Sequence, residues 1–299
     1  MSVSFVSSFY NNSDDVDKFY DELMNQINSL DLEYEIILID DGSQDDTSRV
    51  LRKIVEKNPK VSAFQNITNY GEQKSYTFGL KKASLDYVFI VESDLDINLK
   101  NIPLFLEEIQ KNKEVDMIYA TVKKSLLQKL SISNLFFTIF NKISNLKLPQ
   151  NAAWFRVIRS ELVGDIQDFN EYEFHLAGTL SLLSKKELSI EVIKSKSKSK
   201  YSFFNKYLLA INTFINFTSR PLEVVLGIGF SFVLLNALFL IYLVFFRINY
   251  NPTPGWVSIM FSIFATFTIL LIILGVLSLY ISKIYKEVRQ IPKIISKKL

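Results

Sequence analysis

Two long uncharged segments constrain this chain more than any other feature of its sequence. Residues 224–246 form a run of 23 residues without Asp, Glu, Lys or Arg, and residues 256–280 form a second run of 25. At a helical rise of about 1.5 Å per residue, each run is long enough to cross a hydrocarbon core about 30 Å thick. Uncharged runs of this length are rare in soluble cores. We therefore predict a membrane protein with two transmembrane helices, at 224–246 and 256–280.

The distribution of charge predicts how these helices are oriented. The tail at 283–299 carries six Lys or Arg and one Glu, whereas the linker at 247–255 carries only Arg247. Because positively charged segments stay on the cytoplasmic side, we expect both termini in the cytoplasm.

The net charge of +3 is the sum of a negative N-terminal part and a positive C-terminal part. Residues 1–116 hold 22 acidic and 12 basic residues, whereas residues 117–299 hold 9 acidic and 22 basic residues. The two halves are therefore expected to meet different partners.

The region before the spans alternates between short apolar runs and amphipathic stretches. Strands that alternate with helices are typical of an α/β fold, in which a mostly parallel sheet is covered by helices on both faces. The expected strands are 3–9, 34–40, 61–66, 86–91 and 115–121, and the expected helices are 13–28, 46–57, 71–83 and 101–110.

Two stretches without acidic residues indicate contact with the membrane. Residues 117–160 hold seven Lys or Arg, and within them 125–146 places Leu and Phe on one helical face. This pattern suits a helix at the membrane interface, with an ordinary helix on the domain core as the alternative. Residues 194–200 alternate Lys with Ser before another apolar helix, which favours lipid phosphate over a solvated loop. Nucleic acid is not expected as a partner, because no base-stacking surface accompanies the basic residues.

Five carboxylates lie at the carboxyl ends of predicted strands. In parallel sheets, ligands bind at the carboxyl ends of the strands, so this is where we expect the chemistry. The five residues are Asp40, Asp41, Glu92, Asp94 and Asp96.

Glu92, Asp94 and Asp96 occupy alternate positions after the apolar run 87–91. If the run continues as a strand, the three carboxylates point to one side and repel one another unless a cation neutralises them. The chain has no cysteine and a single histidine, His175, which leaves hard oxygen ligands. Such ligands select Mg²⁺ or Mn²⁺, and magnesium commonly shares its ligand shell with substrate phosphates.

Several motifs extend this pattern into a family resemblance. The segments "YEIILIDDGSQDDTSRVL", "NYGEQKSYTFGL" and "VFIVESDLDINLKNIP" stand in the order and spacing of family 2 glycosyltransferases of the GT-A type. With three later segments, the chain resembles over nearly its whole length the polyprenyl-phosphate glycosyltransferases. These include dolichyl-phosphate mannose synthase and bacterial undecaprenyl-phosphate sugar transferases. The later segments are 151–163, 199–229 and 275–292.

The resemblance implies a fold and a reaction. The expected fold is a cytoplasmic GT-A domain followed by amphipathic interface helices and two transmembrane helices. The expected reaction is an inverting, metal-dependent transfer of a sugar from a nucleotide-diphospho-sugar to a polyprenyl phosphate, with undecaprenyl phosphate as the expected acceptor. The alternative is a non-catalytic membrane subunit that binds a nucleotide-sugar or a partner protein. The oligomeric state stays open, with a homo-oligomer as one option. The composition is rich in Lys, Ile, Asn and Phe, which indicates a bacterial source. We therefore expect the protein in the inner membrane of a bacterium.

The resemblance also implies roles for individual residues. Glu92, Asp94 and Asp96 would surround the metal, and Asp94, Asp96 and Arg156 would be catalytic. The nucleotide-sugar would contact Asp40, Asp41, Asn69, Gln73, Ser93 and Asp94. The acceptor phosphate would contact Lys124, Arg156, Lys194 and Lys200.

Trp154 stands where many members of the family have an acid before the "FR" dipeptide. A polyprenyl phosphate is already anionic at neutral pH, so it needs positioning rather than deprotonation. A general base at this position is therefore dispensable.

The domain organisation that we expect has five regions. They are a nucleotide-sugar-binding part at 1–122, an acceptor part at 123–200 with the interface helix 125–146, a juxtamembrane helix at 201–222, the two spans within 223–281, and a basic cytoplasmic tail at 282–299.

Overall fold

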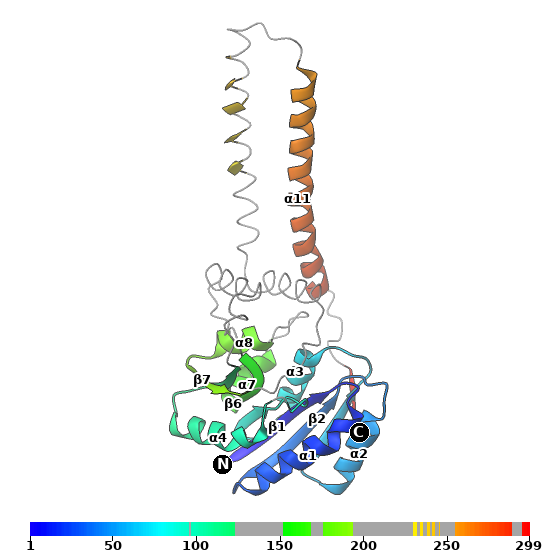
Figure 1. Ribbon diagram of the computed structural model, residues 1–299, viewed down its shortest axis with the longest axis vertical. Helices are drawn as coiled ribbons and strands as arrows, with labels where there is room; N and C mark the ends of the chain where they lie inside the picture. Colours follow the sequence, from blue (N-terminus) through cyan, green and yellow to red (C-terminus); the bar gives the residue numbers. More distant parts are fainter. Residues whose placement is uncertain are drawn as a thin grey trace. The chain divides into compact units, whose positions relative to one another are not determined.

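The computed structural model separates the chain into two compact units, which we describe one at a time (Figure 1). The first consists of Met1–Tyr207 with Pro292–Leu299, and the second of Leu208–Ile291. The described residues are 1–95, 97–122, 152–168, 176–193, 255–288 and 295–299, with positions 230, 231, 234, 235, 238, 239, 241, 242 and 245.

The first unit is an α/β domain built on one sheet. Its strands are β1 (Ser2–Phe9), β2 (Glu33–Asp40), β3 (Val61–Asn66), β4 (Tyr87–Ile90), β5 (Met117–Val122), β6 (Ala152–Arg159), β7 (Glu187–Val192) and β8 (Ser296–Lys298). Its helices are α1 (Ser13–Asn28), α2 (Thr47–Lys57), α3 (Glu72–Lys82), the 3₁₀ turn η1 (Leu99–Asn101), α4 (Ile102–Lys111), α7 (Ser160–Asp168) and α8 (Leu176–Leu183). The five strands and four helices expected from the sequence are all present, with ends that differ by a few residues at most.

The sheet is mostly parallel, as expected. Its strand order is β7-β5-β6-β4-β1-β2-β3-β8. Strands β3, β2, β1 and β4 are parallel neighbours, and β5 is parallel to β7. Strand β6 runs antiparallel to both β4 and β5, and β8 runs antiparallel to β3. The sequence patterns did not predict β6, β7 or β8.

Helices cover both faces of this sheet, so the domain has two apolar cores. Residues that alternate along β1 belong to different cores: Phe5 packs with α1, α2 and α4, whereas Val6 packs with α3, α7 and α8. Every residue of β1 is buried, as expected for a central strand of a parallel sheet covered on both faces.

The chain ends inside the first unit. Strand β8 pairs Lys298 with Phe64 and Ser296 with Asn66 at the free side of β3. The side chain of Leu299 packs against the core that α1 and α2 cover. The last residues of the basic tail therefore form an edge strand of the sheet that the N-terminus begins.

The second unit contains α11 (Trp256–Val288), a helix of 33 residues. Its segment Ala265–Ser282 has a mean hydropathy of 2.3 and none of it is buried, so α11 is long and apolar enough to cross a membrane by length and composition. The positions described within 224–246 are helical. The rest of that predicted span, the interface helix 125–146 and the juxtamembrane helix 201–222 lie outside the described residues.

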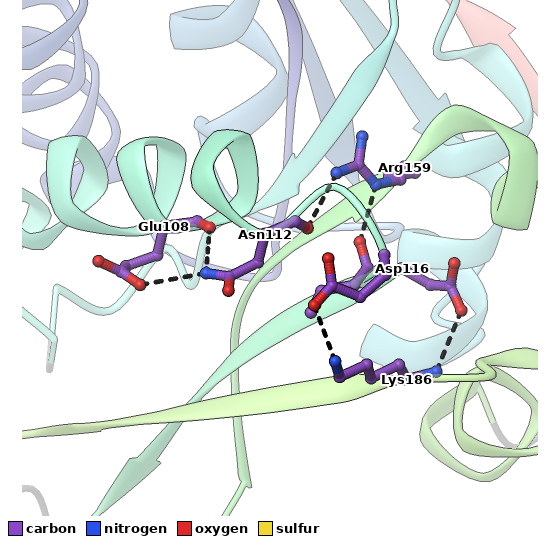
Figure 2. A network of polar contacts seen from close by, with 7 residues as sticks. Glu108, Asn112, Asp116, Arg159 and Lys186 are labelled. Carbon is purple, nitrogen blue, oxygen red and sulfur yellow. Dashed lines mark hydrogen bonds and ion pairs between the residues drawn. The ribbon is translucent and has the colours of Figure 1, made fainter.

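Arg159, at the end of β6, closes the C-terminus of α4 (Figure 2). Its Nη2 donates to the carbonyl of Asn112 at 3.2 Å, a contact that Figure 2 shows. The same Nη2 donates to the carbonyl of Ile109 at 2.9 Å, and Nε donates to the carbonyl of Val115 at 2.7 Å. Its Nη1 also donates to the hydroxyl of Tyr87. A cation at this position satisfies carbonyls that the helix leaves open and interacts favourably with the helix dipole.

We expect Arg159→Met to destabilise the first unit, because several carbonyls lose a charged donor at once. We expect the free energy of unfolding to fall by about 2 kcal/mol, which lowers the thermal midpoint by about 4–8 °C. Differential scanning fluorimetry of the full chain in detergent measures it. The exposed Arg52 provides the matched control, since Arg52→Met should leave the midpoint within about 1 °C. Equal midpoints for the two variants would contradict this role of Arg159.

Candidate functional site

The carboxyl edge of the sheet forms the candidate site. Strand β1 pairs with β2 on one side and with β4 on the other. The strand order therefore reverses between β1 and β4, and open α/β sheets bind ligands at the carboxyl ends of the strands at such a point. Asp40 ends β2, Asp41 follows it, and Glu92 and Asp94 come shortly after β4, so the topology brings both groups of carboxylates to this edge.

Asp40 shapes the turn that follows β2. Its side chain is fully buried, at 0% exposure. Its Oδ1 accepts a hydrogen bond from the N–H of Ser43 at 2.9 Å, and its Oδ2 accepts one from the hydroxyl of Ser48 at 2.6 Å. The carboxylate thus joins the start of the turn to the first turn of α2.

Asp41 joins this turn to the loop before α3. It is 2% exposed. Its Oδ1 accepts from the Asn66 side-chain amide at 2.8 Å and from the Tyr70 N–H at 3.0 Å, and its Oδ2 accepts from the Gly71 N–H at 2.8 Å. Asp41 therefore holds together the two loops on which several predicted nucleotide contacts stand.

Gly42 permits the close approach of these two loops. Its φ is +73°, and a Cβ on it would lie 2.4 Å from the carbonyl carbon of Thr68. Only glycine fits such a position without strain. The glycine of the "DDG" motif therefore brings the loop of Asn69 against the end of β2.

Both Asn69 and Gln73 are predicted nucleotide contacts. Asn69 lies in the loop before α3, and Gln73 lies in the first turn of α3. Asn69 is exposed, and its Oδ1 accepts from the N–H of Gly71 at 3.0 Å. Gln73 is half-buried. Because the Gly71 N–H also donates to Asp41, Asn69 and Asp41 share one donor and belong to one cluster.

The carboxylates after β4 are not carried by a strand, and the alternation expected from the sequence is wrong in this respect. Strand β4 ends at Ile90 and the chain then turns. Leu95 has a φ of +55°, in the left-handed region, which bulky residues rarely adopt outside constrained sites. Ser93 is half-buried, Asp94 is exposed, and Asp96 lies outside the described residues.

Tyr76 of α3 lies close to this acidic turn. Its hydroxyl donates to Glu72 Oε1 at 2.9 Å. Burial raises the pKa of Tyr76 well above its ordinary value, and the nearby charges of Glu72, Glu92 and Asp94 raise it further. The phenol therefore stays protonated, and it marks where the acids of α3 and of the turn after β4 converge.

The antiparallel register of β6 brings Arg156 and Trp154 to the same edge. Arg156 pairs with Ile90, the last residue of β4. Trp154 precedes Arg156 by two residues in β6, and its N–H donates to Glu92 Oε1 at 2.8 Å. Arg156 and Glu92 were both predicted site residues, and their proximity depends on a strand that the sequence patterns did not indicate.

Arg156 is a buried cation whose guanidinium does not use all of its hydrogen-bond donors among the described residues. It is 3% exposed, and its guanidinium carbon lies 4.4 Å from the centre of the Trp154 ring. Its Nη2 donates to the carbonyl of Ala153 at 3.0 Å, and its Nε has no hydrogen-bond partner among the described residues. Burial lowers the pKa of Arg156 to about 10, against the opposing charges of Glu187 and Glu92. The side chain is therefore charged at neutral pH.

Sequence reasoning missed two neighbours of Arg156. Tyr119 of β5 pairs with Arg156 in register, and Glu187 begins β7. Burial raises the pKa of Glu187, although a hydrogen bond from Ser181 and the charge of Arg156 act in the opposite direction. A buried arginine requires a nearby acid, but only the sheet order identifies which one.

Three further predicted phosphate contacts, Lys124, Lys194 and Lys200, lie outside the described residues. In the part of the chain that the structure describes, no three acidic or histidine side chains are grouped closely enough to hold a metal ion. Glu92 and Asp94 nevertheless offer carboxylate oxygens, the donor type that Mg²⁺ and Mn²⁺ prefer. The donor chemistry of this turn fits such an ion.

Relatives named as bactoprenol glucosyl transferases match the chain from end to end. The SfII prophage-derived bactoprenol glucosyl transferase of Shigella flexneri is 28% identical over 305 residues, which cover 100% of this chain and 98% of the relative. The prophage bactoprenol glucosyl transferase homolog of Escherichia coli (strain K12) is 26% identical, with 100% and 99% covered.

Solved structures share the fold. Glucosyl-3-phosphoglycerate synthase from Mycobacterium tuberculosis, in complex with uridine diphosphate, gives a TM-score of 0.50 at 13% identity and covers 70% of this chain and 76% of its own. Mannosyl-3-phosphoglycerate synthase from Rubrobacter xylanophilus gives 0.50 at 15% identity, with 71% of each chain covered. The sequence model of glycosyl transferase family 2 matches residues 4–166, more than half of the chain. The α/β, GT-A-like sheet and this match together establish that the chain belongs to glycosyltransferase family 2.

Proposed function

We propose that this chain transfers a sugar from a nucleotide-diphospho-sugar to a polyprenyl phosphate at the cytoplasmic face of a bacterial membrane. The observation that carries the proposal is the extent of the similarity to bactoprenol glucosyl transferases, which covers 100% of this chain and 98% of the relative from Shigella flexneri. The similarity thus includes the apolar C-terminal region as well as the family 2 domain.

The environment of Arg156 supports an anionic acceptor. A phosphate needs a cation with directional donors, and a guanidinium provides several in one plane. Arg156 is buried, stacked on Trp154 and next to the carboxyl end of β4. In our proposal it binds the phosphate of the acceptor lipid, and Lys124, Lys194 and Lys200 of the membrane-facing stretches assist.

The reaction that we propose is a single displacement. An oxygen of the lipid phosphate attacks the anomeric carbon and forms the new carbon–oxygen bond. The bond from that carbon to the diphosphate breaks, and its electron pair leaves with the nucleoside diphosphate, so the configuration inverts. Because the attacking oxygen is already anionic, no residue has to remove a proton, which agrees with Trp154 in place of an acid.

The acids of the edge have separate roles in this proposal. Asp40 and Asp41, with the predicted contacts Asn69, Gln73 and Ser93, bind the nucleotide part of the donor. Glu92, Asp94 and Asp96 would hold Mg²⁺ or Mn²⁺, which when bound compensates the charge of the diphosphate leaving group. Glu92 also fixes the backbone of Trp154, so it connects the donor side of the site with the acceptor side.

The position of β8 supports the two-span arrangement. Strands β1 and β8 belong to the same sheet, so the first and last residues of the chain lie on the same side of any membrane. The segment between β7 and β8 must therefore cross the membrane an even number of times. Spans at 224–246 and 256–280, with both termini cytoplasmic, satisfy this condition.

Purified full-length protein should form a glycolipid when it is given undecaprenyl phosphate, Mg²⁺ or Mn²⁺ and a panel of nucleotide-sugars. Asp94→Ala should lower the rate at least a hundredfold, because the leaving group loses its charge compensation. Asp21→Ala, at an exposed position of α1, is the matched control and should leave the rate unchanged. Nucleotide binding without product for every donor would favour the non-catalytic alternative.

Arg156→Lys should impair the use of the acceptor. Lysine keeps the charge but loses the planar set of donors and the stacking on Trp154. We expect the KM for the lipid phosphate to rise at least tenfold while the KM for the donor changes less than twofold. Radiolabelled sugar transfer at varied lipid concentration measures the first KM and transfer at varied donor concentration measures the second, with Arg52→Lys as the control. An unchanged lipid KM would remove Arg156 from the acceptor site.

The absence of cysteine from the chain permits a direct test of the membrane topology. A cysteine at Asn251, in the linker between the spans, should react with an impermeant maleimide in intact cells. A cysteine at Lys185, exposed in the first unit, should react only after the membrane is opened. Equal labelling of both positions in intact cells would contradict two spans with cytoplasmic termini.

A further inference from the structure

The end of the chain lies next to the residues that hold Asp41. The Ile67 N–H donates to the carbonyl of Ile295 at 3.0 Å, and the Leu299 N–H donates to the carbonyl of Ala63 at 2.9 Å. Strand β8 is therefore hydrogen-bonded to β3 on both sides of Asn66. The loop that follows Asn66 supplies two N–H groups, those of Tyr70 and Gly71, from which Asp41 accepts hydrogen bonds.

A chain of side-chain hydrogen bonds connects β8 with Asp41. The Ser296 hydroxyl donates to Asn66 Oδ1 at 2.5 Å, although 230 positions separate the two residues. The Nδ2 of Asn66 donates to Asp41 Oδ1 at 2.8 Å and to the Ser75 hydroxyl at 3.0 Å. Asn66 is 2% exposed, so protein groups rather than bulk water must satisfy its amide.

These bonds fix which way the Asn66 amide points. Its NH₂ group has two donors, which both face acceptors, while its oxygen faces the hydroxyl of Ser296. Without that hydroxyl, a buried amide oxygen loses a donor, which costs free energy and permits the amide to rotate. A rotated amide no longer donates to Asp41.

We infer that Ser296, in the last strand of the chain, is a positioning residue for the nucleotide-sugar, acting on Asp41 through Asn66. This inference rests on the proposed function, in which Asp41 contacts the nucleotide. Helix α11 ends at Val288, seven positions before Ile295. The tail after the predicted second span thus contributes to the donor site, although it follows that site by more than 200 positions in the sequence.

A purely architectural role for β8 makes a different prediction. An added strand covers the edge of a sheet through backbone hydrogen bonds, and those bonds do not involve the Ser296 side chain. If β8 only covers β3, replacement of the hydroxyl should have no specific effect on the donor. Side-chain variants therefore separate the two roles.

The test compares Ser296→Ala, Ser296→Thr and Lys297→Ala in the full chain. We expect Ser296→Ala to raise the KM for the donor about three- to tenfold, with kcat and the KM for the lipid phosphate within twofold of the unmodified protein. Ser296→Thr retains a hydroxyl and should restore the donor KM. Lys297 is exposed on the same strand, so Lys297→Ala should behave like the unmodified protein.

A separate binding measurement distinguishes this inference from the proposed function. The full chain is titrated with UDP and with GDP, and isothermal titration calorimetry measures the affinity for each nucleotide. Ser296→Ala should weaken the binding of whichever nucleotide the unmodified protein binds, by the same three- to tenfold factor. Equal binding by the two proteins, or a parallel loss of donor and lipid affinity with a lowered thermal midpoint, would overturn the role of Ser296. Absence of both binding and product in the unmodified protein would instead refute the proposed function on which the inference rests.

Discussion

The pairing of β6 with β4 is the contact on which the rest of the site depends. Because β6 runs antiparallel, Arg156 lies beside Ile90 and the Trp154 N–H reaches Glu92. A shift of one residue would move Arg156 to the opposite face of the sheet, into the apolar core where Phe155 packs. One strand register thus determines that a buried cation and the acids of the next turn share a site.

The arrangement carries a cost that indicates its use. Burial lowers the pKa of Arg156 to about 10, which means that the fold holds a charge in surroundings that disfavour it. The stacking on Trp154 and the charge of Glu187 offset part of this cost. A cation that has already lost its water can bind an anion without further desolvation on its own side. In the proposed function, the phosphate of the acceptor lipid makes use of this property.

Local patterns predicted the elements that are continuous in the sequence. Apolar runs and helical periodicity correctly gave β1 to β5 and α1 to α4, since these signals depend on neighbouring residues alone. These signals did not predict strand β6, because Trp154 and Arg156 interrupt its run of apolar residues. The predicted continuation of β4 as a strand was wrong, because β4 ends at Ile90 and the chain then turns, with Leu95 in a left-handed conformation. Alternation of residue types does not reveal such a turn.

The sequence by itself determined the family, the acids at the ends of β2 and β4, and the apolar runs that suit a membrane. These are properties of residue type and order, and they survive any arrangement of the elements. Only the tertiary structure decided which side chains meet. Glu92 and Trp154 are 62 positions apart, and Asn66 and Ser296 are 230 apart. Hydrogen bonds between such distant residues depend on strand register and packing, which no local pattern encodes.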